Sequence, residues 1–527
     1  MPVHTTAADI PAPVHTVALL DLGSNSLRMM IAQVGEGGSA RIVAQAKQMV
    51  RVGEGSFETH VLQPVPMERT LDALRGFAAL CRDHAVDTVI ALATSAVRDA
   101  VNGREFMELI RRETGLGFTV ISGKEEARLI SLGISSGLES LEGRRIFMDI
   151  GGGSTELSSA SGDEILALDS LKLGAVRLAE LFPEREAGPV SPERYAEMKG
   201  YVREHGVLPL RRMREQGALE LVGSSGTIQY LADIAAALAQ AEGVPASADW
   251  LSMGDLRRAV HALCSRSEEE RRALPGMDPR VTGILIPGAA ILQTVMEELG
   301  FERIRISRRG LRDGALADWL ARRAAPQEEP SVREASVLRL AADCRFEEEH
   351  SRHVSALALM LFDSARELGL AELPGSTREL LHYAALLHDI GIFVSYSRHN
   401  EHSAYLIRNG ELLGFTEYEI YAISILAFFH RVSYNERSLL LKEMDEGKRR
   451  MLRPLSLFLS LAEALDKSHA QSVASVRFFR RGEDRILELT PVRPCTIEKE
   501  RLKQWAPELE SCLGVRHIVW REAERAF

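Results

Sequence analysis

The sequence predicts a mixed α/β protein, with two related α/β halves followed by an all-α segment and a small α+β tail. Two observations carry this prediction. Strand-like apolar runs are followed by glycine- and hydroxyl-rich loops at residues 21–26 and 149–156, and helical apolar spacing replaces this pattern beyond residue 330. With 527 residues, of which 45% are hydrophobic, the chain is long enough for several domains with sizeable cores.

In the first half, the pattern predicts a hairpin over residues 17–34 that turns at the first loop. Apolar residues at helical spacing predict a helix over 67–84, and Ser122 is a suitable N-cap for a helix that begins at Lys124. The other expected elements are strands over 41–52, 89–92 and 118–121 and a helix over 104–114.

The second half repeats this order around the second loop. Its expected elements are strands over 145–149, 155–159, 164–168 and 303–307, and a strand-to-helix glycine turn at 221–227. We therefore predict one domain over residues 16–131 and a second over 132–309. A helix near 310–323 is expected to cross back to the first domain.

Residues 324–330 contain two prolines and several charges, which predicts a linker. The following segment, 331–470, is expected to form a separate helical domain, and it holds eight of the fifteen histidines. The last segment, 471–527, is expected to form a small α+β domain. Its expected elements are strands over 473–479, 486–490 and 516–520 and a helix over 498–512.

The composition disfavours several classes of function. A net charge of −10 argues against a general nucleic-acid binder, although local basic stretches such as 308–312 can still receive a polyanion. The longest uncharged stretch, 281–296, is too short for a membrane span. The first fifteen residues lack the features of a secretory signal, and the five scattered cysteines form no disulfide framework. A cytoplasmic location is the simplest expectation.

The two glycine-rich loops predict a phosphate site with a metal-binding edge. Glycine removes side chains, so that backbone N–H groups can face an anion, and the aspartate before each loop can bind a cation. Asp149 and Glu156 flank the second loop and suit Mg²⁺, which takes few carboxylates and leaves room for phosphate oxygens. The candidate phosphate contacts are Gly23, Ser24, Asn25, Ser26, Gly151, Gly152, Gly153, Ser154 and Thr155.

Two arginines and two glutamates have both a functional and a structural interpretation. Arg28 follows the first loop and Arg98 follows the strand over 89–92. Either arginine can clamp phosphate bidentately or form a surface salt bridge. Glu125 and Glu126 lie in the first turn of a helix, where a carboxylate can deprotonate a water or simply favour the positive end of the helix dipole. Periodicity does not choose between the functional and the structural interpretation of these residues.

Taken in order, the strings DLGSNS, ISGKEEARLI, DIGGGSTEL, VGSSGT and GLRDG resemble the exopolyphosphatase/guanosine pentaphosphate phosphohydrolase (Ppx/GppA) family over about residues 16–320. The resemblance implies two actin/Hsp70/sugar-kinase-like (ribonuclease H-like) domains. It implies that Glu126 is the catalytic base and that Asp149, Glu156 and Asp21 hold Mg²⁺, with a monovalent cation left open. It adds Ser225, Gly226 and Arg312 to the phosphate contacts. Asp313 stands where the family usually has Glu, which keeps the charge.

The resemblance implies a hydrolase that removes terminal phosphate from inorganic polyphosphate, with guanosine pentaphosphate as the alternative substrate. A sugar-kinase-like ATP phosphotransferase and a nucleotide sensor without turnover are further alternatives. A homodimer is also implied, while a membrane or specific nucleic-acid partner is not expected.

The helical segment contains His388-Asp389, which together with His353 and Asp466 resembles the HD phosphohydrolase pattern. These residues form a reasonable divalent-metal set, and His402 and His430 could enlarge it. In the Ppx/GppA family this module is often degenerate, so a second metal site in an HD-like domain remains open.

Overall fold

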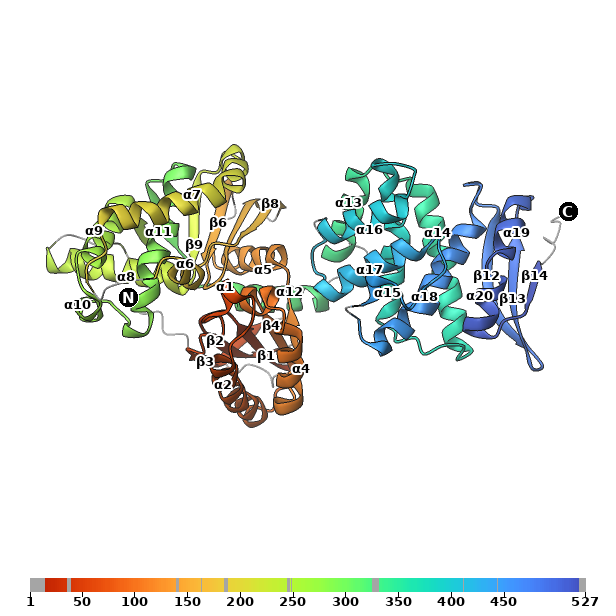
Figure 1. The fold of residues 1–527 in the computed structure, drawn as a ribbon, viewed down its shortest axis with the longest axis horizontal. Helices are drawn as coiled ribbons and strands as arrows, with labels where there is room; N and C mark the ends of the chain where they lie inside the picture. Colours follow the sequence, from red (N-terminus) through yellow and green to blue (C-terminus); the bar gives the residue numbers. More distant parts are fainter. Residues whose placement is uncertain are drawn as a thin grey trace. The chain divides into compact units, whose positions relative to one another are not determined.

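The computed structural model describes residues 15–35, 39–138, 142–162, 164–183, 188–243, 247, 249–324, 331–410, 412–442 and 444–520. The chain divides into two compact units, residues 1–328 (unit 1) and 329–527 (unit 2). The predicted mixed α/β architecture with a helical C-terminal part is confirmed (Figure 1). Most of the predicted linker, residues 325–330, lies outside the described residues.

Unit 1 contains two sheets with the same design. The first sheet has the order β3-β2-β1-β4-β5, in which β1 pairs antiparallel with β2 and parallel with β4. Its strands are β1 (His15–Leu22), β2 (Leu27–Val34), β3 (Ala40–Gln48), β4 (Thr88–Ala93) and β5 (Phe118–Val120).

The second sheet has the order β10-β11-β9-β6-β7-β8, and here β6 pairs antiparallel with β7 and parallel with β9. The predicted repetition of hairpin, loop and crossover is therefore present in the backbone. The strands are β6 (Arg144–Ile150), β7 (Thr155–Ser161), β8 (Glu164–Leu171), β9 (Glu220–Ser224), β10 (Trp250–Ser252) and β11 (Arg303–Ile306).

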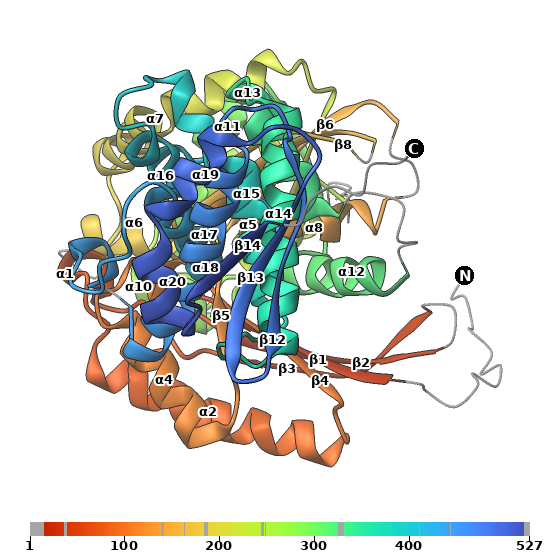
Figure 2. The same ribbon diagram turned by 90° about the vertical axis from the view of Figure 1, so that its right-hand side faces the viewer.

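Helices cover both faces of the first sheet (Figure 2). α2 (Pro64–Asp83) and α4 (Gly103–Thr114) pack on one face around Leu74, Phe77 and Phe106. α5 (Gly123–Ser135) and α12 (Leu311–Ala324) cover the other face, where Ala315 and Leu316 join the strand residues in one apolar cluster. The helix predicted near 310–323 thus packs on the first sheet, although it follows the second sheet in sequence.

α5 and α12 cross in close backbone contact at two glycines. A Cβ added at Gly314 would overlap the carbonyl of Leu129, and a Cβ added at Gly133 would overlap the carbonyl of Gly310. α5 begins as predicted, because the Ser122 hydroxyl accepts the N–H of Glu125 at 3.1 Å. The crossing fixes the helix that carries Glu126 against the helix that carries Arg312.

The second sheet is covered by α6 (Ala175–Leu181), α7 (Pro192–Glu215), α8 (Gly226–Ala241), α9 (Met253–Cys264) and α11 (Thr282–Leu299) (Figure 1). Among the described residues, one helical stretch, Pro279–Leu299, has the length and hydropathy of a membrane span, and 78% of its apolar window is buried within the fold. Ile286, Ile291 and Val295 lie in the apolar core beside the second sheet, as in the core helix of a globular fold. The short elements here are α1 (Ser56–Thr59), α3 (Ser95–Asp99), α10 (Glu268–Arg272) and η1 (Pro279–Val281).

Unit 2 is helical as far as Leu465, and a three-stranded sheet of order β12-β13-β14 follows. One apolar core runs through its helices and its sheet. The helices are α13 (Val332–Asp343), α14 (Glu348–Glu367), α15 (Thr377–Leu387), η2 (Ile390–Phe393), α16 (His399–Asn409), α17 (Glu417–Phe429), η3 (Leu439–Leu441) and α18 (Glu446–Leu465).

The strands of the tail, β12 (Val473–Arg481), β13 (Asp484–Pro491) and β14 (His517–Trp520), confirm the three predicted strands. The single helix predicted over 498–512 is wrong. Two helices stand there, α19 (Thr496–Lys503) and α20 (Ala506–Leu513), because Pro507 has no N–H to continue a helix but fits the first turn of a new one.

Candidate active site

The two glycine-rich loops face each other across a pocket in unit 1. Each loop is closed by the same backbone turn: the Gly23 N–H donates to Ser26 O at 3.1 Å, and the Gly151 N–H donates to Ser154 O at 2.9 Å. The registers also match, with Asp21 opposite Arg28 and Asp149 opposite Glu156. The repeated hairpin therefore brings two equivalent aspartates and two equivalent turns to one site.

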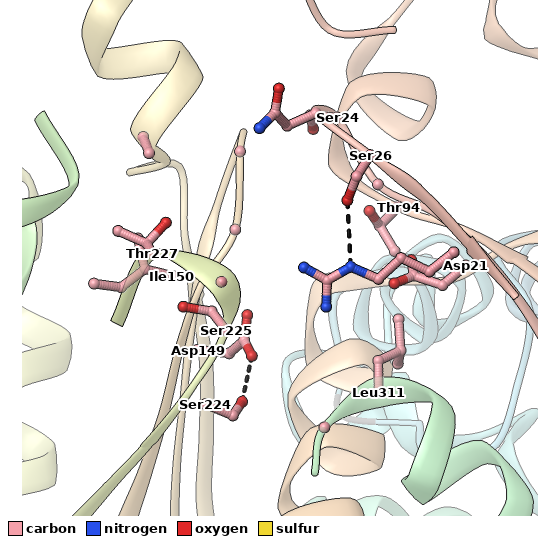
Figure 3. A pocket seen from close by; sticks show the side chains of 18 of the residues that line it. Asp21, Ser24, Ser26, Thr94, Asp149, Ile150, Ser224, Ser225, Thr227 and Leu311 are labelled. Carbon is pink, nitrogen blue, oxygen red and sulfur yellow. Dashed lines mark hydrogen bonds between the residues drawn. The ribbon is translucent and has the colours of Figure 1, made fainter. Parts of the chain in front are cut away.

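The pocket has one wall from the part of unit 1 built on the first sheet (the first lobe) and one from the part built on the second sheet (the second lobe) (Figure 3). Asp21, Ser26 and Thr94 lie on one side, and Asp149 and Ser225 lie on the other. The predicted residues that line it are Asp21, Gly23, Ser24, Asn25, Ser26, Arg28, Glu126, Asp149, Gly151, Gly152, Ser154, Ser225, Gly226 and Arg312. The close approach of the loops requires a glycine, since a Cβ at Gly152 would lie 2.9 Å from the Ser24 Cβ.

The N-terminus of α8 also opens into the pocket at Ser225 and Gly226. Ser225 has a φ of 98°, a region that favours glycine, and its hydroxyl accepts the N–H of Ile228 at 3.3 Å. Such a backbone conformation costs about 1–3 kcal/mol and persists mainly at functional sites. A helix N-terminus favours an anion, so this wall suits phosphate.

Buried carboxylates crowd the floor of the site. Burial raises the pKa of Asp149 to about 6, although the Ser224 hydroxyl donates to its carboxylate. Burial also raises the pKa of Asp21, and it raises the pKa of Glu156 well above its usual range. One oxygen of Glu156, Oε2, is buried and has no hydrogen-bond partner among the described residues. A cation would satisfy this group of oxygens.

Glu126 reaches the pocket from the first turn of α5, and burial raises its pKa to about 7 despite the opposing charge of Arg98. Arg98 Nη1 donates to Glu126 Oε2 at 3.0 Å and to the Ile121 carbonyl at 2.9 Å. Arg98 is not among the described residues that line the pocket. It was predicted as a phosphate clamp, but the structure places it as the partner of Glu126.

Glu125 has a different environment from its neighbour. Its two oxygens accept from the Arg128 guanidinium at 2.8 and 2.7 Å, and Arg128 also contacts Asp318 of α12 at 2.9 Å. Glu125 therefore stabilises the packing of α5 on α12. The geometry separates two glutamates that periodicity could not distinguish.

Three predicted site residues lie behind the pocket wall. The Thr155 hydroxyl donates to the Leu173 carbonyl, and Gly153 O accepts from Arg177 Nε at 2.7 Å. Glu156 is 1% exposed, and its Oε1 accepts from Ser170 at 2.8 Å. Gly153, Thr155 and Glu156 are thus absent from the residues that line the cavity, and the polar group of each is bound within the fold.

The sequence did not indicate several residues of the pocket. Lys47, at the end of edge strand β3, donates to the Tyr230 hydroxyl at 3.2 Å across the pocket, and burial together with Arg28 lowers its pKa to about 8. Lysines are common on solvent-exposed edge strands, so no sequence pattern indicated that this one lines a pocket. The other unpredicted lining residues with polar side chains are Thr94, Ser95, Ser224, Thr227, Gln229, Tyr230 and Asp313. Arg308 and Arg309 also line the pocket, and they belong to the basic stretch 308–312 that the sequence offered for a polyanion.

Two arginines of the pocket are bound to the first hairpin, one through a side chain and one through the backbone. Arg28 Nε donates to Ser26 Oγ at 3.3 Å, and Arg312 Nη1 donates to the Met29 carbonyl at 3.0 Å. Asp313 accepts the Gly310 N–H at 3.0 Å, so the shorter acid at this position still caps the start of α12. The arginines are held in place before any ligand arrives.

In unit 2 the predicted metal set needs correction. His350, not His353, meets His388, Asp389 and Glu463, and His399, not His402, meets Asp389 and His430. The predicted residue Asp466 binds the second nitrogen of His350, with Nδ1 to Oδ2 at 2.8 Å. On each helix the residue in the cluster lies three positions before the predicted one and on nearly the same face, so the packing of the helix decides which of the two reaches the cluster.

Models of one protein family match both units of the chain. A model of the Ppx/GppA phosphatase family matches residues 30–323, and a model of Ppx/GppA phosphatase, domain III, matches residues 332–511. An exopolyphosphatase from Cytophaga hutchinsonii is 26% identical, with a TM-score of 0.54, over 58% of this chain and 98% of that one. An exopolyphosphatase-like protein is 29% identical, with a TM-score of 0.53, over 59% and 99%.

Proposed function

Because this chain belongs to the Ppx/GppA phosphatase family, we propose that it is an exopolyphosphatase, which hydrolyses the terminal phosphate of inorganic polyphosphate. The observation that carries the proposal is the position of Glu126. It is a buried carboxylate with a raised pKa that lines the same pocket as two glycine-rich loops, Arg28 and Arg312. A base beside an anion site is the arrangement that hydrolysis of a phosphoanhydride requires.

The side chains divide the work between binding and proton transfer. The loops, the N-terminus of α8, Arg28 and Arg312 hold the terminal phosphoryl group and neutralise its charge. Glu126 orients a water in line with the P–O–P bond and takes its proton at a carboxylate oxygen, while Arg98 fixes the other side of that carboxylate. The bond to the bridging oxygen breaks, and orthophosphate and a shortened chain leave.

We propose that Asp21 and Asp149, which line the pocket, hold Mg²⁺ together with phosphate oxygens, and that Glu156 adds negative charge from behind the wall. Oxygen donors of this kind suit the ion, and the unpartnered Glu156 Oε2 and the raised pKa values of the acids indicate negative charge without a counterion. When bound, magnesium neutralises phosphate oxygens. Chelation with EDTA is expected to remove phosphate release, and added Mg²⁺ is expected to restore it.

The chemistry of the pocket favours a linear polyanion over guanosine pentaphosphate. Its lining includes Arg28, Lys47, Arg308, Arg309 and Arg312. Tyr230 is its single aromatic side chain among the described residues, and the Tyr230 hydroxyl is bound to Lys47 and Asp278. A nucleobase would find little to stack on.

The test is phosphate release from polyphosphate, guanosine pentaphosphate and ATP, measured side by side. We expect the highest kcat/KM with polyphosphate. A higher value with guanosine pentaphosphate would replace the proposal with the second candidate, and ATP-dependent labelling of an acceptor would indicate a phosphotransferase.

The pH profile tests the environment of Glu126. The base works as the carboxylate, so kcat/KM is expected to rise as the pH increases through about 7, the pKa of Glu126. Since the charge of Arg98 lowers that pKa, Arg98→Met is expected to move the rise to higher pH. Arg111→Met, on the exposed face of α4, serves as the control and should leave the profile in place. An unchanged profile for Arg98→Met would contradict the assigned pairing.

A further inference from the structure

Unit 2 buries four histidines and two carboxylates in one place, here called the histidine cluster. They come from three helices (α14, α16 and α18) and from the ends of α15 and α17, and they are His350, His388, Asp389, His399, His430 and Glu463. All six are buried except Asp389, whose side chain is 15% exposed. Their ligand atoms form two groups, each within 4.8 Å, and Asp389 belongs to both.

The outward contacts of two imidazoles fix their tautomers. His388 Nδ1 lies 2.7 Å from the Ala385 carbonyl, and His430 Nδ1 lies 2.6 Å from the Ala427 carbonyl. A carbonyl only accepts, so each Nδ1 carries a proton, and in the neutral ring each Nε2 presents a lone pair. In this way metal-binding histidines are usually oriented by the backbone.

These Nε2 atoms face carboxylate oxygens, which are themselves hydrogen-bond acceptors. His388 Nε2 lies 3.2 Å from Glu463 Oε2, and His430 Nε2 lies 3.3 Å from Asp389 Oδ1. His399 Nε2 lies 3.2 Å from His430 Nε2 and 3.0 Å from the same Asp389 oxygen. Neutral imidazole nitrogens and carboxylate oxygens that converge in this way repel one another unless a proton or a metal ion lies between them.

Asp389 supplies a second, independent observation. Its Oδ1 is buried and has no partner of hydrogen-bond geometry in the described structure, although three imidazoles surround it. A buried carboxylate oxygen without a hydrogen bond is unfavourable unless an ion lies beside it. This oxygen is aimed into the cluster rather than at solvent.

His350 has the same construction with a carboxylate behind it. Its Nδ1 lies 2.8 Å from Asp466 Oδ2, while its Nε2 lies 3.0 Å from Glu463 Oε2. Asp466 is fully buried, and its other oxygen accepts the Gln471 N–H at 2.7 Å. A carboxylate behind a histidine orients the ring and raises its basicity as a ligand.

We propose that the histidine cluster binds two divalent transition-metal ions that share Asp389. His350, His388 and Glu463 complete one position, and His399 and His430 complete the other. Mixed imidazole and carboxylate donors suit Mn²⁺, Fe²⁺, Co²⁺ and Zn²⁺ better than Mg²⁺. The second position has three protein ligands, so it keeps room for water or an anion. The proposal does not depend on the activity of unit 1.

The test is elemental analysis of the full-length chain, purified without chelators from medium that contains these metals. About two equivalents per chain are expected. His350→Gln and His430→Gln should each lose one equivalent, and Asp389→Asn should lose both. His353→Gln and His402→Gln are matched controls from the neighbouring turns of α14 and α16, and they should keep both.

Co²⁺ added to the metal-free wild-type chain gives a readout that needs no variant. Imidazole-bound cobalt is expected to give visible absorption bands that saturate near two equivalents. A single equivalent that every cluster variant removes would overturn the two-ion assignment. A metal-free chain with no cobalt bands would overturn the site and leave protonated histidines paired with the carboxylates.

Discussion

Glu126→Gln is expected to lower kcat for phosphate release from polyphosphate by about 10²- to 10⁴-fold, the usual contribution of a general base. Glutamine keeps the shape of the side chain and can still accept the hydrogen bond from Arg98, which reaches Oε2 at 3.0 Å. It cannot take a proton from water. Binding of polyphosphate should change little, since the loops and arginines that hold the phosphate are untouched.

The neighbouring residue gives the control. Glu125→Gln loses the charge paired with Arg128 at 2.7 Å, so this variant should melt at a lower temperature but keep a near-normal kcat. Steady-state kinetics and thermal melting of both variants distinguish the two roles. Phosphate release by Glu126→Gln at a rate close to that of the wild-type chain would rule out Glu126 as the base.

Gly314→Ala is expected to destabilise unit 1 by about 3 kcal/mol, at the upper end of the usual range for overpacking. The added methyl group would overlap the Leu129 carbonyl, a backbone atom that no side-chain rotation can move away. α12 would have to separate from α5, and this would shift Arg312 relative to Glu126. We therefore expect a lower melting temperature and a lower kcat together.

Gly76→Ala in α2 is the matched control. A Cβ at Gly76 would meet nothing within 4 Å, so alanine should be neutral or should stabilise the helix by up to about 1 kcal/mol. Chemical denaturation monitored by circular dichroism measures both changes. Equal stability of Gly314→Ala and the wild-type chain would show that the helices cross with more room than the structure gives them.

The features that sequence predicted well were those set by local chemistry. The hydroxyl of Ser122 caps α5, and apolar periodicity located α2 and the hairpins. The choice between His350 and His353 could not be made in the same way, because both lie on α14 and only the packing of that helix shows which one faces Asp389. Spacing shows that the two histidines lie on a similar face of the helix, but it does not show which of them reaches the cluster.

The same limit applies to the pocket. Glu156 follows a glycine-rich loop as a metal ligand would, yet it is bound to Ser170, its partner on β8, and does not line the pocket. Lys47 reaches the pocket from a strand whose sequence marks it as an exposed edge. In both cases the side chain's direction depends on strand pairing between residues that are distant in sequence.

The placement of α12 has a consequence for how the chain folds as it leaves the ribosome. One face of the first sheet, with Val17 and Leu19, is closed by Ala315 and Leu316, which are translated after the whole second lobe. The second lobe, residues 144–306, is continuous and can complete its core first, as domains generally do during synthesis. The first lobe must wait with an apolar face uncovered, so nascent chains that stop before residue 311 are expected to need chaperone protection.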